Sequence, residues 1–302
     1  MSGGARRDNE DGFVLVSVVM VLAAVSAVLA TAILQTRANA ALARTRADLV
    51  NLQGMADGIT RLLAHDLAVA RTYRLAGLGL PEDGSPVACA LPSGRVAVVS
   101  LEDQGRLIDL NRTPRPAMEE AFRILGVPDS TALALGAEIA DYRDADDVPE
   151  PNGGAELAQY RARGFPYGPR NGPFLSVDEI GRLPSMTPEI AARLQPALTV
   201  YNEAGSFDLA SLVRRLRPSG PLPPQDGRRT PSPRQYFRMS VTLAQGTARA
   251  GRVGVYALGG TRTGTDFLVW QPGVALSATP GTDHPACAAI RAALTTSELR
   301  GS

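Results

Sequence analysis

The stretch 13-FVLVSVVMVLAAVSAVLATAIL-34 decides the architecture of this chain, because none of its 22 residues carries a charge. As an α-helix it would extend over about 33 Å, the thickness of the hydrocarbon core of a bilayer. No second segment of this kind follows in the sequence, so we expect one membrane-spanning helix, with the bulk of the chain on one side. Apolar residues recur at helical spacing from Gln35 to Arg71, which predicts that the same helix continues to about Val69.

Composition divides the chain into two parts. All 23 prolines lie at or after Pro81, and proline is excluded from helix interiors because it lacks an amide donor and clashes with the preceding turn. The first 80 residues can therefore form a long helix, whereas the remainder must have a different structure. With 31 basic and 30 acidic residues in 302, the net charge of +1 argues against a nucleic-acid binder that uses its whole surface.

The junction Asp11-Gly12-Phe13 has a polar leader that ends in glycine and an aromatic residue that opens the apolar run. A plain membrane anchor would also fit this pattern. A secretory signal peptide cut after Ala38-Asn39-Ala40 is a further alternative, although its apolar core is usually shorter.

The same junction resembles the leader of type IV pilins and pseudopilins, in which prepilin peptidase cuts after the glycine and methylates the new N-terminus. The resemblance implies cleavage between Gly12 and Phe13. Most pilins carry glutamate at the fifth mature position, where this chain has Ser17. A glutamate in hydrocarbon needs a partner, which in that family is thought to be the N-terminal amine of the subunit above. Ser17 therefore indicates a tip subunit that has no subunit above it.

Short strand-like runs flank a helical middle section. Strands are predicted at Val87–Ala90, Arg95–Leu101, Arg106–Leu110, Leu198–Tyr201, Tyr236–Leu243, Ala248–Leu258 and Phe267–Val269. Helices are predicted at Ala117–Leu125, Ser130–Tyr142, Glu156–Arg163, Val177–Leu183 and Pro188–Leu194, and within Gly205–Arg217. We therefore predict an α+β, pilin-like fold, in which a long N-terminal helix packs on an antiparallel sheet that carries a large inserted helical domain. The predicted divisions are 1–12 (leader), 13–34 (transmembrane), 35–110 (helix and first strands), 111–200 (inserted domain) and 201–302 (last strands).

The segment 141-DYRDADDVPEPNGGAE-156 holds six carboxylates in 16 residues. Such density suits either a solvated loop or a site for calcium, which prefers hard oxygen ligands. The spacing is not that of an EF-hand, because Val148 stands where a ligand is needed and Pro149 where the glycine belongs.

This loop and the segment 166-PYGPRNGPFLSVDEI-180 are similar to the minor pseudopilin K family of the type II secretion system. The shared features are Asp144-Ala145-Asp146, Gly154-Ala155-Glu156, Tyr160, Pro166-Tyr167, Asn171 and Val177-Asp178-Glu179-Ile180. The family binds calcium in this insert, and the resemblance implies the ligands Asp144, Asp146 and Glu156, joined by Asp141 and Asp147. Tyr142 and Leu157-Ala158-Gln159 depart from the family pattern, which has tryptophan near the loop and an acidic run after the Gly-Ala-Glu.

The resemblance also implies a function and partners. It implies a non-enzymatic subunit at the tip of the pseudopilus, with minor pseudopilins I and J, that primes assembly and supports export of folded proteins through the outer membrane. Its other partners would be the major pseudopilin, prepilin peptidase and the inner membrane, which the chain would cross once with its bulk in the periplasm. The alternative is a single-span, membrane-anchored calcium-binding or adhesive periplasmic protein outside secretion.

Two further features bear on these expectations. In an oxidising periplasm, Cys89 and Cys287 are candidates for a disulfide, which depends on their separation in the fold. The run 180-IGRLPSMTPEIAARL-194 looks like a helix-hairpin-helix, but Ser185-Met186-Thr187 replaces the glycines that grip phosphate, and the chain has no lysine. We therefore expect no nucleic-acid partner.

Overall fold

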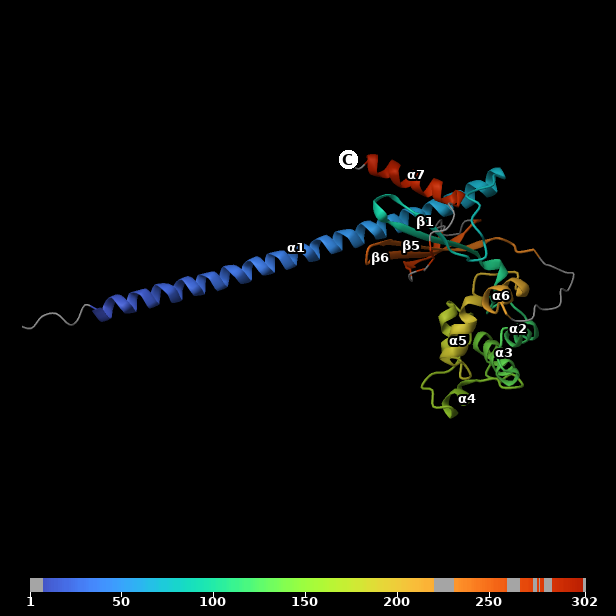
Figure 1. Cartoon of the computed structure of the whole chain (residues 1–302). Coiled ribbons are helices and arrows are strands. Elements are labelled where there is room, and N and C mark those ends of the chain that lie inside the picture. The colour runs from blue at the N-terminus through green and yellow to red at the C-terminus, as the bar shows by residue number, and fades with distance from the viewer. Residues whose placement is uncertain are drawn as a thin grey trace, which may run out of the picture.

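The computed structural model describes residues 8–219, 231–259, 267–273, 276, 278–279 and 284–300. Its dominant element is helix α1, Asp8–Tyr73, whose N-terminal half extends far beyond the rest of the molecule (Figure 1). At 1.5 Å per residue, its 66 residues span about 99 Å. Among the described residues α1 is the one helix long and apolar enough to cross a membrane. It exceeds the predicted bounds at both ends and ends where Arg74 takes a left-handed φ of 55°.

The main sheet has five antiparallel strands in the order β1-β2-β5-β6-β7. The strands are β1 (Val87–Ala90), β2 (Val96–Asp103), β5 (Tyr236–Gln245), β6 (Ala248–Ala257) and β7 (Phe267–Pro272). Alternating apolar residues of these strands face α1, which lies over β5 and β6. The predicted α+β class, with a long helix on an antiparallel sheet, is confirmed.

A second helix, α7 (Pro285–Arg300), packs beside α1 and was absent from the sequence-based prediction. Its buried residues Cys287 and Ile290 join the core formed by α1 and the sheet. Cys287 forms a disulfide with Cys89 of β1, with a Cα–Cα distance of 5.3 Å. The alanine-rich run has no strong apolar stripe, so its sequence gives little sign of a helix.

The helical domain is inserted between β2 and β5. It contains α2 (Arg115–Ile124), α3 (Asp129–Arg143), α4 (Leu157–Ala162), α5 (Pro188–Leu194) and α6 (Leu209–Leu216), with a 3₁₀ turn at Val177–Arg182 that was predicted as a helix. Strands β3 (Ile108–Asp109) and β4 (Leu198–Thr199) pair in parallel and form a separate two-stranded sheet.

The inserted domain is larger than the predicted 111–200. Leu107 and Ile108 belong to its hydrophobic core, as do Leu212 and Val213 of α6. The run Arg106–Leu110 was assigned to the pilin-like sheet and Gly205–Arg217 to the last division, but both belong here. The reason is that β3 pairs with β4, a partner about 90 positions away that local pattern does not reveal.

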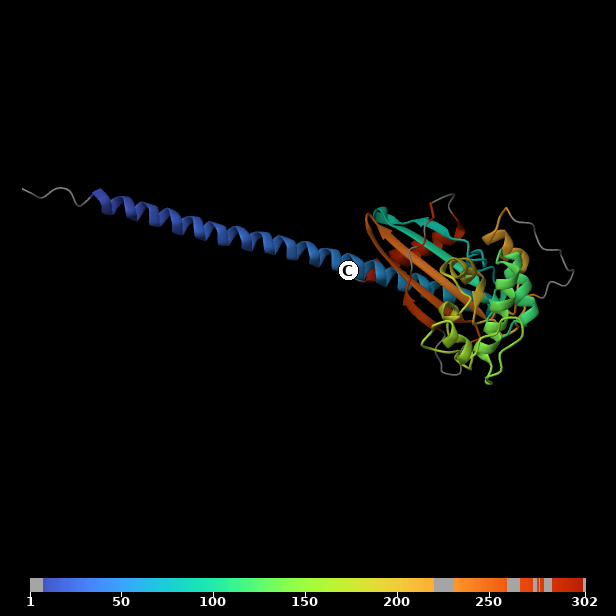
Figure 2. The ribbon, with the colours of Figure 1, turned by 90° about the horizontal axis from the view of Figure 1, so that it is seen from below.

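Arg215 of α6 joins the two domains. It pairs with Glu102 of β2 and donates to the carbonyl of Asp83 at 2.7 Å. Within the helical domain, Arg106 pairs with Asp208 at 2.9 Å. Figures 1 and 2 agree that the helical domain lies at the end of the molecule away from the free half of α1.

Candidate functional site

The acidic loop connects α3 to α4 and brings three predicted ligands together. One carboxylate oxygen from each of Asp144, Asp146 and Glu156 lies within 4.8 Å of the other two. Asp141, in the last turn of α3, lies beside this cluster and is fully buried. Asp147 is outside it and accepts a hydrogen bond from Asn171 at 3.4 Å.

Four carboxylate oxygens of this loop are buried without a hydrogen-bond partner among the described residues: Asp141 Oδ2, Asp144 Oδ1 and both oxygens of Glu156. Glu156 as a whole is only 3% exposed. Buried carboxylates without donors are costly, and buried polar groups in folded proteins nearly always have partners. Buried carboxylate oxygens that converge in this way are a set that fits a hard cation such as calcium.

Burial and mutual repulsion raise the pKa values of these acids. Burial, followed by the charges of Asp141 and Asp144, raises the pKa of Glu156 to about 7. Burial is also the largest cause that raises the pKa values of Asp141 and Asp144. The site therefore favours either protons or a cation over bare negative charge.

Two glycines let the loop close around the acids. Gly153 has a φ of 116°, a conformation that residues with a Cβ rarely adopt. At Gly154 a Cβ would lie 2.4 Å from Asp141 Oδ2 and 2.4 Å from the Glu150 amide nitrogen, so no larger residue fits. The Gly-Gly pair in the sequence therefore brings Glu156 back toward α3.

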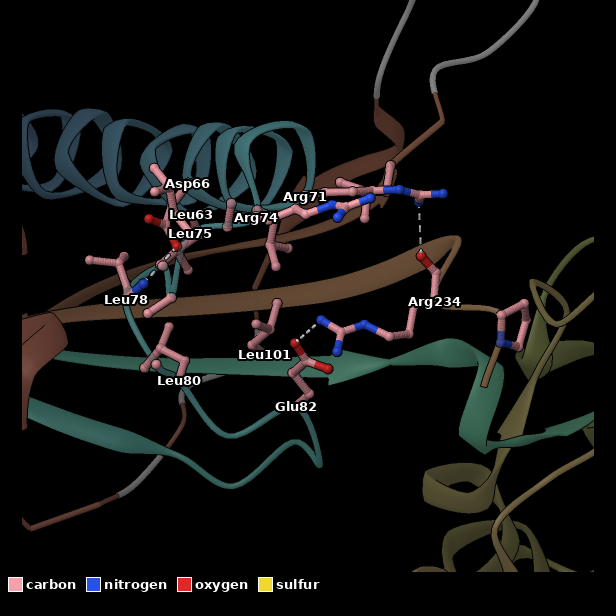
Figure 3. A pocket seen from close by; sticks show the side chains of 17 residues that line it. Leu63, Asp66, Arg71, Arg74, Leu75, Leu78, Leu80, Glu82, Leu101 and Arg234 are labelled. Carbon is pink, nitrogen blue, oxygen red and sulfur yellow. Dashed lines mark hydrogen bonds and ion pairs between the residues drawn. The ribbon is translucent and has the colours of Figure 1, made fainter. Parts of the chain in front are cut away.

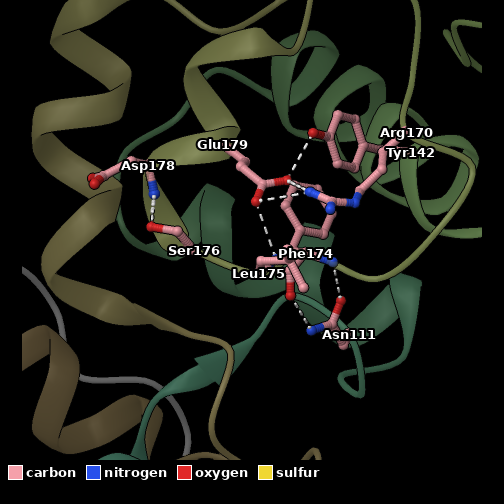
Figure 4. A network of polar contacts seen from close by, with 8 residues as sticks. All are labelled: Asn111, Tyr142, Arg170, Phe174, Leu175, Ser176, Asp178 and Glu179. Atoms are coloured by element: carbon pink, nitrogen blue, oxygen red, sulfur yellow. Dashed lines mark hydrogen bonds and ion pairs between the residues drawn. The ribbon is translucent and has the colours of Figure 1, made fainter. Parts of the chain in front are cut away.

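A polar network holds the neighbouring segment 170–176 against α3 (Figure 4). Glu179 accepts hydrogen bonds from the Tyr142 hydroxyl at 2.8 Å and from the Leu175 amide at 3.1 Å, and it pairs with Arg170. Although burial acts to raise it, these contacts keep the pKa of Glu179 below its usual value. The network fixes the segment that contains Asn171 beside the acidic loop. The side-chain nitrogen of Asn171 donates to the Asp146 carbonyl at 3.3 Å.

Asn111 fixes the same segment from the other side. Its side chain accepts from the Phe174 amide at 2.7 Å and donates to the Phe174 carbonyl at 3.0 Å, while the Phe174 ring stacks on Tyr142. Sequence reasoning missed Asn111 and Arg170, because nothing local in the sequence links them to residues that lie far along the chain.

A separate cavity of about 490 Å³ lies at the end of α1 (Figure 3). Much of its lining is leucine: Leu63, Leu67, Leu75, Leu78, Leu80, Leu101 and Leu258. Its two acids are engaged in structure, because Asp66 accepts from the Leu78 amide at 2.9 Å and Glu82 pairs with Arg234 at 2.5 Å. Among the described residues, therefore, it brings together no set of free acids, bases or metal ligands.

The predicted cleavage junction lies within α1. The backbone of Gly12 and Phe13 is helical, as is that of Ser17. Residues 1–7 of the predicted leader lie outside the described residues.

Comparison with known proteins gives one family and one fold. Residues 95–203 match the family model described as type II secretion system (T2SS), protein K. No curated protein matches the sequence. The fold is similar to a chain in the crystal structure of the GspK-GspI-GspJ complex from the type 2 secretion system of enterotoxigenic Escherichia coli, with a TM-score of 0.54 and 15% identity over 80% of this chain and 100% of that one. The matched residues contain the whole acidic loop, so this part of the chain is similar in sequence to protein K of the type II secretion system, and the whole chain is similar in fold to the solved structure.

Proposed function

We propose that this chain forms the tip of the type II secretion pseudopilus together with minor pseudopilins I and J, above the major pseudopilin. There it primes assembly, and growth of the fibre beneath it supports export of folded proteins across the outer membrane. The observation that carries the proposal is the bulky helical domain at the end of the molecule away from the apolar half of α1 (Figures 1 and 2). A domain of this size beside the sheet would obstruct a further subunit stacked on that end. The similarity to a complex of GspK with GspI and GspJ supports the two partners.

We further propose that the N-terminus is processed as a prepilin. Prepilin peptidase cuts between Gly12 and Phe13 and methylates Phe13, and the apolar half of α1 then anchors the subunit in the inner membrane with its bulk in the periplasm. Ser17 supports the tip position, because no amine from a subunit above is needed to neutralise it.

The acidic loop is proposed to bind calcium through Asp144, Asp146 and Glu156, with Asp141 beside them and Asp147 at the edge. The support is the set of four buried carboxylate oxygens that lack donors. Bound calcium would supply positive charge to these oxygens and so tie the loop to α3.

Processing is tested by the intact mass and N-terminal sequence of the membrane-extracted chain, expressed with and without prepilin peptidase. We expect a methylated Phe13 start only when the peptidase is present. An Ala41 start would indicate a secreted protein, and an unprocessed Met1 start in both samples would leave a plain anchor.

Tip assembly is tested by co-expression of the full chain with minor pseudopilins I and J, followed by extraction in detergent and size-exclusion chromatography. We expect one ternary complex that contains all three subunits. If processed chain eluted apart from both partners, the tip proposal would fail and the anchored calcium-binding alternative would gain support.

A further inference from the structure

Arg115 is the first residue of α2, a place where the helix dipole disfavours positive charge. Its side chain is nevertheless 17% exposed and has every nitrogen in use. Nε pairs with Glu119 at 2.6 Å, Nη1 pairs with Glu150 at 2.7 Å, and Nη2 donates to the carbonyl of Pro151 at 2.7 Å. Two of these three contacts are to the acidic loop.

Arg115 is itself held in place by Glu119. A Cβ at Gly136 of α3 would lie 2.4 Å from Cγ of Glu119, so this carboxylate side chain packs directly on the backbone of α3. The side chain of Glu119 is 11% exposed. Glu119, which is packed between α2 and α3, therefore holds Arg115 in the position from which it contacts the loop.

The loop residues that Arg115 holds are bonded in turn to the candidate metal ligands. The Glu150 amide donates to Asp141 Oδ1 at 2.9 Å, and the Gly154 amide donates to the Glu150 carbonyl at 3.0 Å. The first bond occupies one oxygen of Asp141 and leaves Oδ2 buried without a partner. The second sets the position of Gly154, two residues before Glu156.

We propose that Arg115 is a positioning residue that orders the acidic loop before a divalent cation binds. The inference rests on the proposed calcium site and adds a residue that touches none of its ligands. Arg115 offsets the charge of Glu150, which would otherwise add to the repulsion among the acids, and it leaves the four open oxygens free. Without it, cation binding would have to order the loop as well, and that cost would lower the affinity.

The affinity is measured by calorimetric titration of calcium into the full chain in detergent, after removal of metal with a chelator. We expect Arg115→Ala to weaken the affinity about 10- to 100-fold, as loss of a supporting contact around a metal site typically does. Arg115→Lys should fall between, because an ammonium cannot make three contacts in fixed directions. Arg123→Ala is the control, since Arg123 lies on the same helix and its ion pair within the described part of the chain is with the exposed Glu120, at 2.9 Å.

The order of the metal-free loop is measured separately, by the rate at which a serine endoprotease specific for acidic residues cuts between residues 144 and 156 in chelator. We expect this cleavage to be several-fold faster in Arg115→Ala than in the parent, and unchanged in Arg123→Ala. Equal rates in the parent and Arg115→Ala would contradict pre-ordering whatever the calcium result.

The outcomes separate this inference from the function on which it rests. If the parent bound no calcium, the proposed metal site and the role of Arg115 toward it would both be wrong, while tip assembly would still be judged by complex formation. If the parent and Arg115→Ala bound calcium equally well, only the role of Arg115 would be wrong. Near-ultraviolet circular dichroism checks that each variant folds. If the alanine variant does not fold, Arg115→Lys is compared with the parent instead.

Discussion

Replacing Cys89 and Cys287 together by alanine should lower the free energy of unfolding of the pilin-like domain by about 4 kcal/mol. The disulfide joins residues 198 positions apart and connects α7 to β1. Loss of so long a closed loop raises the entropy of the unfolded chain, and α7 also loses its covalent tie to the core. The measurement is denaturant unfolding followed by the fluorescence of Trp270, the one tryptophan of the chain.

Trp270 is a suitable reporter because it lies on β7 and contacts the pilin-like core. Its ring packs against Phe267 with centroids 4.8 Å apart, and the Arg252 guanidinium lies 4.8 Å above it. The control is the parent in reducing agent, which should unfold at the same denaturant concentration as the alanine variant, whereas the variant should not respond to reductant. If reductant left the Trp270 transition of the parent unchanged, the disulfide would contribute nothing to stability.

The second large effect is a loss of stability with rising pH in the metal-free helical domain. Glu156 has a pKa of about 7 in the folded protein and an ordinary value of 4.5, so the folded state holds more protons between these two values. The contribution of Glu156 to the free energy of unfolding is therefore greatest below about pH 4.5. It falls as the pH rises to about 7, by on the order of 3 kcal/mol. The raised pKa values of Asp141 and Asp144 act in the same direction.

Calcium should reverse this dependence, because it binds the deprotonated acids. At 100 times its dissociation constant it adds about 2.7 kcal/mol, and more at higher concentration. The measurement is urea unfolding of the full chain from pH 5 to pH 8, with chelator and with calcium. It is followed by near-ultraviolet circular dichroism of the tyrosines, of which Tyr142 and Tyr160 are buried in the helical domain.

The matched variants are Glu156→Gln and Glu120→Gln. The first should flatten the pH dependence in chelator and lose most of the stabilisation by calcium. The second changes an exposed acid of α2 and should alter neither. A metal-free parent that became more stable from pH 5 to pH 7 would show that the converging acids are not buried as described.

Much of the fold could be predicted locally. The strands of the main sheet lie within three residues of their predicted bounds, and α5 begins and ends at the predicted residues Pro188 and Leu194, because Thr187 caps it and Pro188 fits its first turn. The prediction failed for α7 and for the limits of the inserted domain. Both depend on where a segment packs, and a weakly amphipathic or very short element carries little signal of that.

The candidate site divides in the same way. The density of acids and the Gly-Gly pair mark the loop in the sequence, and the resemblance to the protein K family pointed to Asp144, Asp146 and Glu156. The supporting residues Arg115, Asn111 and Arg170 carry no such mark, because the contacts of Arg115 with Glu150 and of Asn111 with Phe174 join positions 35 and 63 apart.

The sequence by itself determined the membrane-length helix, the alternation of the strands and the acidic composition of the loop, because each follows from residue type at short spacing. Only the tertiary structure decided that β3 pairs with β4, that α7 closes the core beside α1, and that four oxygens of the loop lie buried without donors. The physical reason is that burial and pairing depend on which distant segments the fold brings together, and the charge state of Glu156 depends on both.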